Sequence, residues 1–503
     1  MKVKKVRLGK KEIIFGSLLI ILFLISRLIN LTVLPIFCDE AIYIRWAQII
    51  KSVPELKFIP LSDGKQPLFM WLMIPFLKIF SDPLFAGRSV SVLAGFGSLV
   101  GVFLLSLLLF GSKKTAFLGS LIYTVLPYTL FFDRMALVDS LLVALGIWVL
   151  VLGILVVKNL QIKTAVFCGI ILGLALLTKS PAVFFALLLP LTGILIEKIN
   201  FKNLIKLGFL WLVVFIIGFG IYNLLRLSPQ FYMIGLRNKD YVFSLKEVLS
   251  HPHDPIIVHL KDVVNWFPNL FTWPILILAI LGVFWGLIKK LKEALVLVGW
   301  CLIPLIVQSF VAKVFNSRYL LFTIFPLIVF GGLALDKFLS FFKSKFIKTG
   351  IILIIFLFAL KYDFFLLTSP QDAPLTYEMR KGYLSEWTSG WGIKEVKNYL
   401  LKILKEEKEV VVGTEGFWGT LPDGLQIYFD KESKIKILGV GLGFREIPKP
   451  LKEAAINKIP TFLVGNLSRL GIGEKEGLEV VLEIPKPVSP EDFQDYLVLY
   501  RLK

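Results

Sequence analysis

Apolar runs of membrane-spanning length recur along the first 368 residues of the chain. A helix needs about 20 apolar residues to cross a bilayer core, and tilt or a thinner local core accommodates somewhat shorter runs. The pattern predicts eleven transmembrane helices plus juxtamembrane helices. The eleven runs are 13–34, 84–110, 115–132, 137–157, 164–178, 181–197, 204–227, 271–288, 293–313, 319–340 and 347–367.

A twelfth apolar run, 67–80, contains two prolines and is only long enough for about 21 Å of helix, short of a core of about 30 Å. Lysine-rich loops favour the cytoplasmic side, and leaving this run out of the count places six Lys-rich segments there. They are Met1–Glu12, Gly111–Thr115, Lys158–Lys163, Glu197–Lys206, Lys289–Glu293 and Asp336–Lys348. We therefore expect 67–80 to be a juxtamembrane or interfacial helix. We expect a multi-pass cell-membrane protein with a cytoplasmic N-terminus and an extracytoplasmic C-terminal domain.

The polarity of the chain changes after residue 368. The whole chain has 56 basic and 36 acidic residues, of which 19 and 20 lie from 369 onward, so residues 1–368 hold 37 and 16, a balance of +21. These basic residues lie between apolar runs, which favours a role in topology and lipid contact and argues against a nucleic-acid partner. The sequence predicts two domains: a transmembrane domain, 1–368, and a soluble domain, 369–503.

The soluble domain has the pattern of a small α/β fold. Five short apolar runs predict strands and two amphipathic segments predict helices. The strands are 409–413, 434–440, 461–465, 478–484 and 496–502, and the helices are 393–404 and 450–456. The Gly-rich stretch 439–443 has no clear helix after it, so we expect no nucleotide site there.

Asp39 and Glu40 follow the first predicted span and begin an amphipathic segment, 41–51, that we expect to lie on the membrane surface. An acidic residue at a helix N-terminus is a favourable cap. A structural role and a catalytic role are equally compatible with the spacing.

Further charged residues lie at the predicted outer ends of helices. The cations are Lys65, Arg88, Arg134, Lys179 and Arg318, and Asp139 lies slightly inside the fourth apolar run. Ionisable groups inside a membrane helix are functional candidates. The structural alternative is that the cations anchor helix ends and that Arg134 pairs with Asp139.

The three histidines of the chain lie in one predicted outer loop, 228–270. His251, His253 and Asp254 could hold a divalent metal, although an ordinary polar loop is the favoured interpretation. Three widely separated cysteines predict no disulfide framework. No cofactor is certain, and a divalent metal is the one candidate.

An ordered set of motifs resembles the GT-C superfamily of membrane glycosyltransferases, in particular the branch of protein O-mannosyltransferases and the aminoarabinose transferase of lipid A. The resemblance covers residues 10–340. Its pieces are Asp39-Glu40, Lys65-Gln66-Pro67-Leu68 with Trp71, Phe85-Ala86-Gly87-Arg88-Ser89, the stretch 132–139, the stretch 173–181, and Arg318-Tyr319-Leu320-Leu321 with Pro326. Gln66 stands where relatives often have proline or another residue. The Trp-Trp-Asp motif of oligosaccharyltransferases is absent, which disfavours that branch.

The resemblance implies inverting transfer of a sugar from a polyprenyl-phosphate-linked donor to a lipid, glycan or protein acceptor at the outer membrane surface, as in cell-envelope glycosylation. Asp39 would be the general base, with Glu40 beside it and Asp139 as a second acid. Lys65, Arg88 and Arg134 would contact the donor phosphate, with Lys179 and Arg318 as weaker candidates. A transporter or flippase of lipid-linked glycans is the alternative function. It is disfavoured because few charges lie deep in the apolar runs and no internal repeat is evident.

Overall fold

The computed structural model describes residues 9–251, 253–444, 446–471 and 477–503. Most of the predicted basic N-terminal segment, residues 1–8, lies outside this range. The chain forms two compact units, each described here by itself. The first contains Met1–Ile29, Lys57–Trp71 and Arg88–Leu367; the second contains Asn30–Leu56, Leu72–Gly87 and Thr368–Lys503. Whether the functional domains divide at residue 368 stays a prediction.

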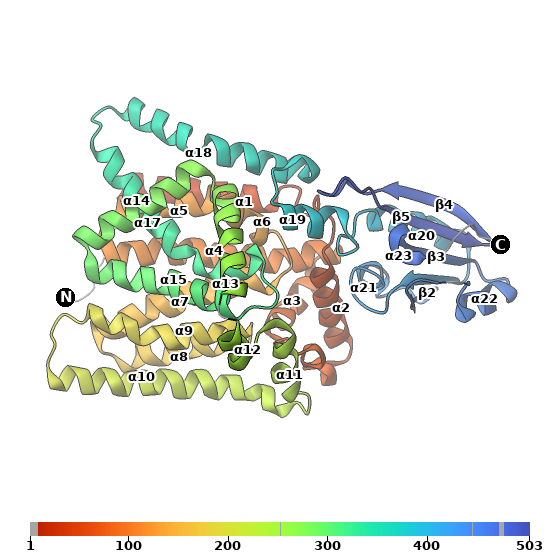
Figure 1. The fold of residues 1–503 in the computed structure, drawn as a ribbon, viewed down its shortest axis with the longest axis horizontal. Helices are drawn as coiled ribbons and strands as arrows, with labels where there is room; N and C mark the ends of the chain where they lie inside the picture. The colour runs from red at the N-terminus through yellow and green to blue at the C-terminus, as the bar shows by residue number, and fades with distance from the viewer. Residues whose placement is uncertain (1–8, 252, 445, 472–476) are drawn as a thin grey trace. The chain divides into compact units, whose positions relative to one another are not determined.

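The first unit is helical, and each of the eleven predicted runs coincides with a helix or with consecutive helices (Figure 1). The helices are α1 (Lys10–Leu28), α4 (Pro83–Phe110, which begins in the second unit), α5 (Lys113–Val125), α6 (Pro127–Asp133), α7 (Val138–Asn159), α8 (Ile162–Leu176), η3 (Ser180–Ala182), α9 (Val183–Leu188), η4 (Leu189–Leu195), α10 (Phe201–Tyr222), η5 (Asn223–Leu227), α14 (Trp273–Lys289), α15 (Leu291–Val311), α16 (Ser317–Leu320), η6 (Leu321–Thr323), α17 (Phe325–Ser340) and α18 (Lys345–Thr368). The short run 67–80 forms helix α3 (Leu68–Ile79), which begins in the first unit and continues into the second, and η2 (Ile59–Asp63) precedes it.

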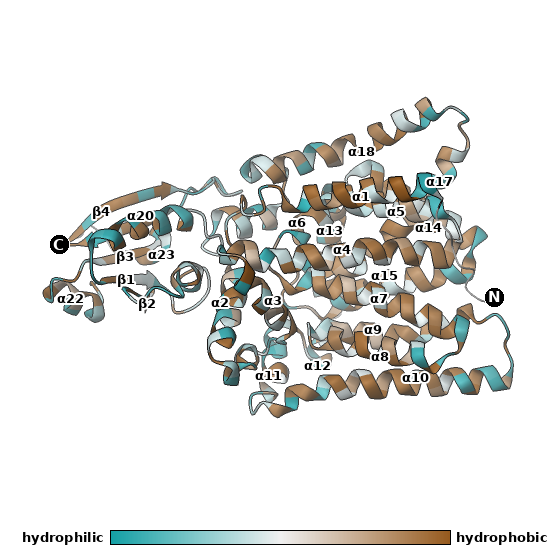
Figure 2. Ribbon diagram, turned by 180° about the vertical axis from the view of Figure 1, so that it is seen from behind, coloured by the Kyte–Doolittle hydropathy of each residue, from teal (hydrophilic) through white to brown (hydrophobic). Residues whose placement is uncertain are grey.

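Among the described residues, five helices are long and apolar enough to cross a membrane, or eight if each of three bent helix pairs is one span. Three further apolar helical segments are shorter: Leu68–Ile79, Ile162–Leu176 and Ser180–Leu195. Figure 2 shows that the long helices are coloured as hydrophobic along most of their length. In α7, 78% of the most apolar window is buried, against 28% in α10 and α18. A helix that is apolar all round and buried lies inside a bundle, so α7 is central and α10 and α18 face outward.

Proline residues explain the three bends. The pairs α5–α6, α13 (Asp254–Phe271)–α14, and α16/η6–α17 bend by 62°, 111° and 60°. Pro127, Pro274 and Pro326 stand in the first turn of the second helix of each pair. Proline lacks an amide proton and is accommodated at a helix start but not in its interior, so each pair contains two helices joined at an angle.

Contacts link segments that the sequence places on one side of the membrane. Lys113 Nζ lies 2.8 Å from Glu12 Oε2, and Ser112 Oγ donates to Asp336 Oδ2 at 2.8 Å. Lys158 Nζ donates to the Leu108 carbonyl at 2.7 Å, at the end of α4. These three contacts join four of the six predicted Lys-rich segments or the helix ends beside them. The predicted count of eleven spans exceeds the five to eight candidate spans among the described residues and stays a prediction. That this end is cytoplasmic stays a prediction.

The second unit contains a five-stranded sheet in the order β2-β1-β3-β5-β4. The strands β1 (Val410–Glu415), β2 (Ile435–Gly441) and β3 (Thr461–Asn466) are parallel, whereas β5 (Tyr496–Leu502) runs antiparallel to β3 and to β4 (Leu478–Pro485). All five predicted strands are therefore confirmed. The helical elements of this unit are α2 (Cys38–Ser52), η1 (Pro54–Leu56), η7 (Pro370–Asp372), α19 (Tyr377–Arg380), η8 (Lys381–Ser385), α20 (Ile393–Glu406), α21 (Asp423–Gln426), η9 (Ile427–Phe429), α22 (Lys449–Ile456) and α23 (Leu467–Leu470).

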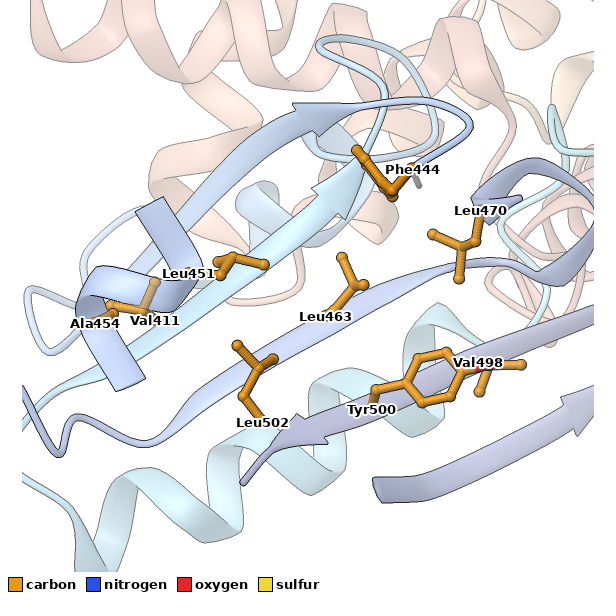
Figure 3. Close-up of a cluster of buried hydrophobic side chains, with 9 residues drawn as sticks. All are labelled: Val411, Phe444, Leu451, Ala454, Leu463, Leu470, Val498, Tyr500 and Leu502. Atoms are coloured by element: carbon orange, nitrogen blue, oxygen red, sulfur yellow. The ribbon is translucent and has the colours of Figure 1, made fainter. Parts of the chain in front are cut away.

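One hydrophobic cluster joins this sheet to its helices (Figure 3). Leu463 of β3 and Val498 of β5 are buried, and Leu451 of α22 and Leu470 of α23 pack against the sheet with them. Gly413 in β1 permits this packing, because a Cβ there would lie 2.6 Å from the Leu451 side chain. Helix α20 buries Ile393, Val396, Leu400 and Leu404, the spacing of a single helix face.

Gly95 is required where α4 passes the carboxylate of Asp133, because a Cβ at Gly95 would lie 2.6 Å from that carboxyl group. We predict that Gly95→Ala destabilises the detergent-solubilised protein by about 1–3 kcal/mol, as overpacking does. The control is Gly208→Ala in α10, where a Cβ meets nothing within 4 Å and alanine favours the helix. Thermal unfolding should show a lower midpoint for the first variant only; equal midpoints would contradict the close packing.

Candidate active site

Asp139 holds two of the predicted cations together. Its side chain, at the start of α7, is 4% exposed; Oδ1 lies 2.7 Å from Lys179 Nζ and Oδ2 lies 3.7 Å from Arg318 Nε. Lys179 comes from the turn after α8, and Arg318 begins the bent pair α16/η6–α17. The ring of Tyr319 lies beneath both cations, 4.3 Å from Lys179 Nζ and 5.2 Å from the Arg318 guanidinium carbon. The alternative pairing of Asp139 with Arg134 is not among the ion pairs that the structure records between described residues.

Hydrogen bonds join the loop that carries Lys65 to the turn that carries Lys179. Gln66 Nε2 donates to Ser180 Oγ at 2.9 Å, and the Leu68 amide donates to the Leu177 carbonyl at 3.2 Å. Lys65 Nζ itself lies 3.5 Å from the Tyr241 hydroxyl. The two lysines that lie 114 positions apart in the sequence therefore come from adjoining backbone segments.

Asp139 contacts Lys179 and Arg318 directly. Lys65 is grouped with them because its loop is hydrogen-bonded to the turn that carries Lys179. These three cations and one carboxylate leave a balance of 3 − 1 = +2. We call this group the cation cluster. A site with this balance can stabilise the two negative charges of a phosphate monoester, because charge-assisted hydrogen bonds from Lys and Arg to phosphate are among the strongest in proteins.

Arg134 caps a helix. Its Nη1 donates to the carbonyls of Ser26, Arg27 and Ile29 at 3.1, 2.9 and 2.8 Å, at the C-terminus of α1. A cation there compensates the helix dipole and the carbonyls that lack a helical partner. Any contact between Arg134 and a phosphate would have to use its other nitrogens, so its role in phosphate binding stays a prediction.

A buried ion pair adjoins this cap. Arg27 is 0% and Asp133 1% exposed; Arg27 Nη2 lies 3.4 Å from Asp133 Oδ2, and the Tyr123 hydroxyl donates to the same carboxylate at 3.1 Å. Arg27 also donates to the carbonyls of Thr124 and Tyr123. Buried charges need such partners. Here Nη1 and Nη2 of Arg27 have them, whereas its buried Nε has none among the described residues.

Two further buried charged residues, Arg27 and Asp363, were not predicted as site residues from the sequence. Asp363, 7% exposed in α18, lies within electrostatic range of Arg27 and Arg134, and fully buried Arg88 lies within range of Arg134. Both missed residues are ionisable groups inside or beside apolar runs, which is the signal that would have found them.

Asp39 and Glu40 lie in the first turn of α2, in the second unit. Glu40 is 0% exposed, and its Oε2 accepts a hydrogen bond from the Phe37 amide at 2.9 Å, so this carboxylate fixes the start of the helix. Asp39 is partly exposed. The local geometry therefore gives Glu40 a structural role and leaves Asp39 accessible to solvent.

The histidines do not form a metal site among the described residues. The predicted loop 228–270 is largely helical, with α11 (Tyr232–Tyr241), α12 (Leu245–Ser250) and α13. His251 Nδ1 lies 3.8 Å from Asp254 Oδ2, both side chains are more than 70% exposed, and His253 precedes α13. In the part of the chain that the structure describes, no three His, Cys, Asp or Glu side chains gather as metal ligands would.

The buried pair leads to a stability prediction. Removing one partner of a buried ion pair leaves an uncompensated charge and costs about 3–5 kcal/mol, whereas removing both costs much less. We expect Arg27→Met and Asp133→Leu each to lower the thermal midpoint strongly, and the double variant to recover much of the loss. Additive losses in detergent unfolding would show that the two charges are not coupled.

Comparisons with known proteins agree with this architecture. The model of the family described as dolichyl-phosphate-mannose-protein mannosyltransferase matches residues 64–222. A comparison of the sequence with curated proteins finds no significant match. The solved structures that resemble the chain include ArnT from Cupriavidus metallidurans in the apo state, with 13% identity, a TM-score of 0.59 and 97% coverage of each chain.

Two further structures extend the likeness. The same ArnT bound to undecaprenyl phosphate has 14% identity, a TM-score of 0.55 and 97% coverage of each chain. The oligosaccharyltransferase of Archaeoglobus fulgidus in the apo form has 12% identity and a TM-score of 0.50, with 90% of this chain and 69% of that chain covered. These findings confirm the predicted resemblance: the chain is a multi-pass membrane protein with the fold of the GT-C glycosyltransferases, and the family match of residues 64–222 indicates a glycosyltransferase.

Proposed function

We propose that the protein is an inverting glycosyltransferase that moves a sugar from a polyprenyl-phosphate-linked donor to an acceptor at the outer membrane surface. The observation that carries the proposal is the cation cluster, in which Asp139 holds Lys179 and Arg318 beside the Lys65 loop. The undecaprenyl phosphate bound to the similar ArnT structure supports a donor of this lipid class. The positive-inside distribution of lysine supports the outer location.

In this reaction an acceptor hydroxyl or amine attacks the anomeric carbon, and the bond from that carbon to the phosphate oxygen breaks. The donor is a phosphodiester with one negative charge, and the leaving polyprenyl phosphate carries a second. A site with a balance of +2 stabilises the transition state more than the ground state, which is what accelerates a reaction. Attack from the face opposite the phosphate inverts the anomeric configuration.

Asp39 is the proposed general base. It is partly exposed, and the resemblance of the Asp39-Glu40 motif to the GT-C superfamily implies a catalytic acid at this position. It takes the proton of the acceptor as the new bond forms. Glu40 is bonded to the start of its own helix, which favours a supporting role. Asp139 is paired with two cations, which favours an orienting role over a second catalytic acid.

The role of Asp39 leads to a direct test. Asp39→Asn should lower transfer by about 10²–10⁴-fold, the usual contribution of a general base, without lowering the affinity for undecaprenyl phosphate. The matched substitution Glu40→Gln should lower the thermal midpoint and retain most of the transfer activity. Transfer is measured by mass spectrometry with undecaprenyl-phosphate-linked mannose, glucose and aminoarabinose. Transfer by Asp39→Asn at the wild-type rate would disprove the assignment. If the wild-type protein moved solute across the membrane without transferring sugar, that result would favour a transporter.

The cation cluster leads to a second test. Lys179→Ala and Arg318→Ala should each weaken binding of undecaprenyl phosphate about 10-fold or more, because each removes a charge-assisted contact of about 1.5–3 kcal/mol. The control is Lys158→Ala, a lysine at the predicted cytoplasmic end whose Nζ is bonded to the Leu108 carbonyl. Native mass spectrometry gives the dissociation constants. Equal losses in all three variants would show that the effect is nonspecific.

A further inference from the structure

The loop after β1 exposes two adjacent aromatic side chains. Phe417 is 72% and Trp418 63% exposed, and Leu442 in the loop after β2 is 51% exposed. Buried aromatic side chains contribute strongly to stability, so two aromatic rings left in solvent contribute little to the fold. Neighbouring exposed apolar groups of this kind are characteristic of binding surfaces.

The backbone on either side of this aromatic pair is fixed. Gly416 and Gly419 flank the pair with φ of +70° and +104°, a region that favours glycine. The Gly416 amide donates to the Gly441 carbonyl at 2.7 Å, and the Gly419 amide donates to Asp423 Oδ2 at 2.6 Å. Gly439 leaves room for the loop, because a Cβ there would lie 2.9 Å from Phe417 Cα. The rings are therefore held by a preorganised loop, which lowers the entropic cost of binding a ligand.

The same loop contacts the start of α2, within the second unit. A Cβ at Gly419 would lie 3.0 Å from Cys38 Sγ and 3.6 Å from the Trp387 ring. The Cys38 amide also donates to the Thr388 carbonyl at 2.9 Å. Asp39, the proposed general base, is the next residue after Cys38, so the aromatic pair belongs to a loop that directly adjoins the acid-bearing turn.

The position in the sheet and the nearby charges indicate the kind of ligand. Ligands of open α/β sheets bind outside the carboxyl ends of the parallel strands, and both loops leave β1 and β2 at those ends. At the end of β1, Arg469 Nη1 lies 3.6 Å from Glu415 Oε1, and the Arg469 guanidinium stacks on Trp387 at 4.1 Å. Aromatic rings next to hydrogen-bonding groups suit a pyranose ring, which has an apolar C–H face and a polar hydroxyl edge. Glu415 is 3% exposed and also accepts hydrogen bonds from Asn466, so Arg469, 23% exposed, is the member of the pair that can meet a ligand. A hydroxyl edge can accept a hydrogen bond from Arg469, whereas an acyl chain cannot.

We infer that Phe417 and Trp418 form the stacking surface of an acceptor subsite for a saccharide ring, whose hydroxyl is thereby presented to Asp39. The inference rests on the proposed function and adds the acceptor class to it. Stacking on Phe417 and Trp418 contributes to acceptor binding, whereas the donor is held by other residues.

The experiment compares the wild type, the double variant Phe417→Ala/Trp418→Ala, and Phe493→Ala in nanodiscs. Phe493 lies in the segment between β4 and β5 of the same unit, and its side chain is 56% exposed. Each protein receives an undecaprenyl-phosphate sugar from the donor panel and one of three acceptors: a fluorescent alkyl glycoside, a Ser/Thr peptide without a sugar, or water alone. Trp418→Phe is tested separately for tryptophan quenching by brominated lipid.

We expect the double variant to raise KM for the glycoside at least 10-fold, with kcat, donor hydrolysis and transfer to the peptide unchanged, and Phe493→Ala to match the wild type. The inference would be overturned if KM for the glycoside were unchanged in the double variant, or if the double variant lost transfer equally with all acceptors. It would also be overturned if the wild-type protein transferred sugar to the peptide but not to the glycoside. A drop in bromolipid quenching in Trp418→Phe would also overturn it, because Trp418 would then lie in the bilayer. If the wild type turned over the donor with neither the glycoside, the peptide nor water, that result would instead count against the proposed function.

Discussion

The ion pairs of Asp139 with Lys179 and Arg318 are the contacts on which the proposed site depends. They join the starts of α7 and α16 to the turn after α8, three positions that are far apart in the sequence. In an apolar surrounding an unpaired charge is expensive, so a carboxylate that is 4% exposed must keep its cations close. Because one carboxylate faces several cations, the pairing leaves positive charge for a ligand while it fixes the positions of the side chains.

The buried pair of Arg27 with Asp133 and the helix cap formed by Arg134 stabilise the packing of helices. They hold the end of α1 against α5 and α6 through carbonyl groups and a tyrosine hydroxyl. Two neighbouring residues of one motif, Asp133 and Arg134, thus have partners that explain them structurally, whereas Asp139, six positions after Asp133, belongs to the cation cluster. A motif shared with a family therefore combines residues that build the fold with residues that are available for chemistry.

The helices and strands could be predicted from the sequence because each depends on local periodicity. All eleven apolar runs are helical, and all five strands and both helices predicted for the second unit are present. The helical content of 228–270 was not predicted, because polar residues and prolines interrupt its apolar pattern; α13, for example, contains Pro268. The partners of Asp139 could not be predicted either, since the assignment to Arg134 relied on closeness in sequence and the observed partners lie 40 and 179 positions away.

The claim that the cation cluster receives a phosphate leaving group is tested most directly by comparing two ligands that differ by one charge. Binding of undecaprenyl phosphate and of an undecaprenyl-phosphate sugar to the wild-type protein in nanodiscs can be measured across salt concentrations by native mass spectrometry or calorimetry. The charge balance of the cluster predicts tighter binding and a steeper salt dependence for undecaprenyl phosphate, which carries the extra negative charge. Equal affinities with equal salt dependence would contradict the claim.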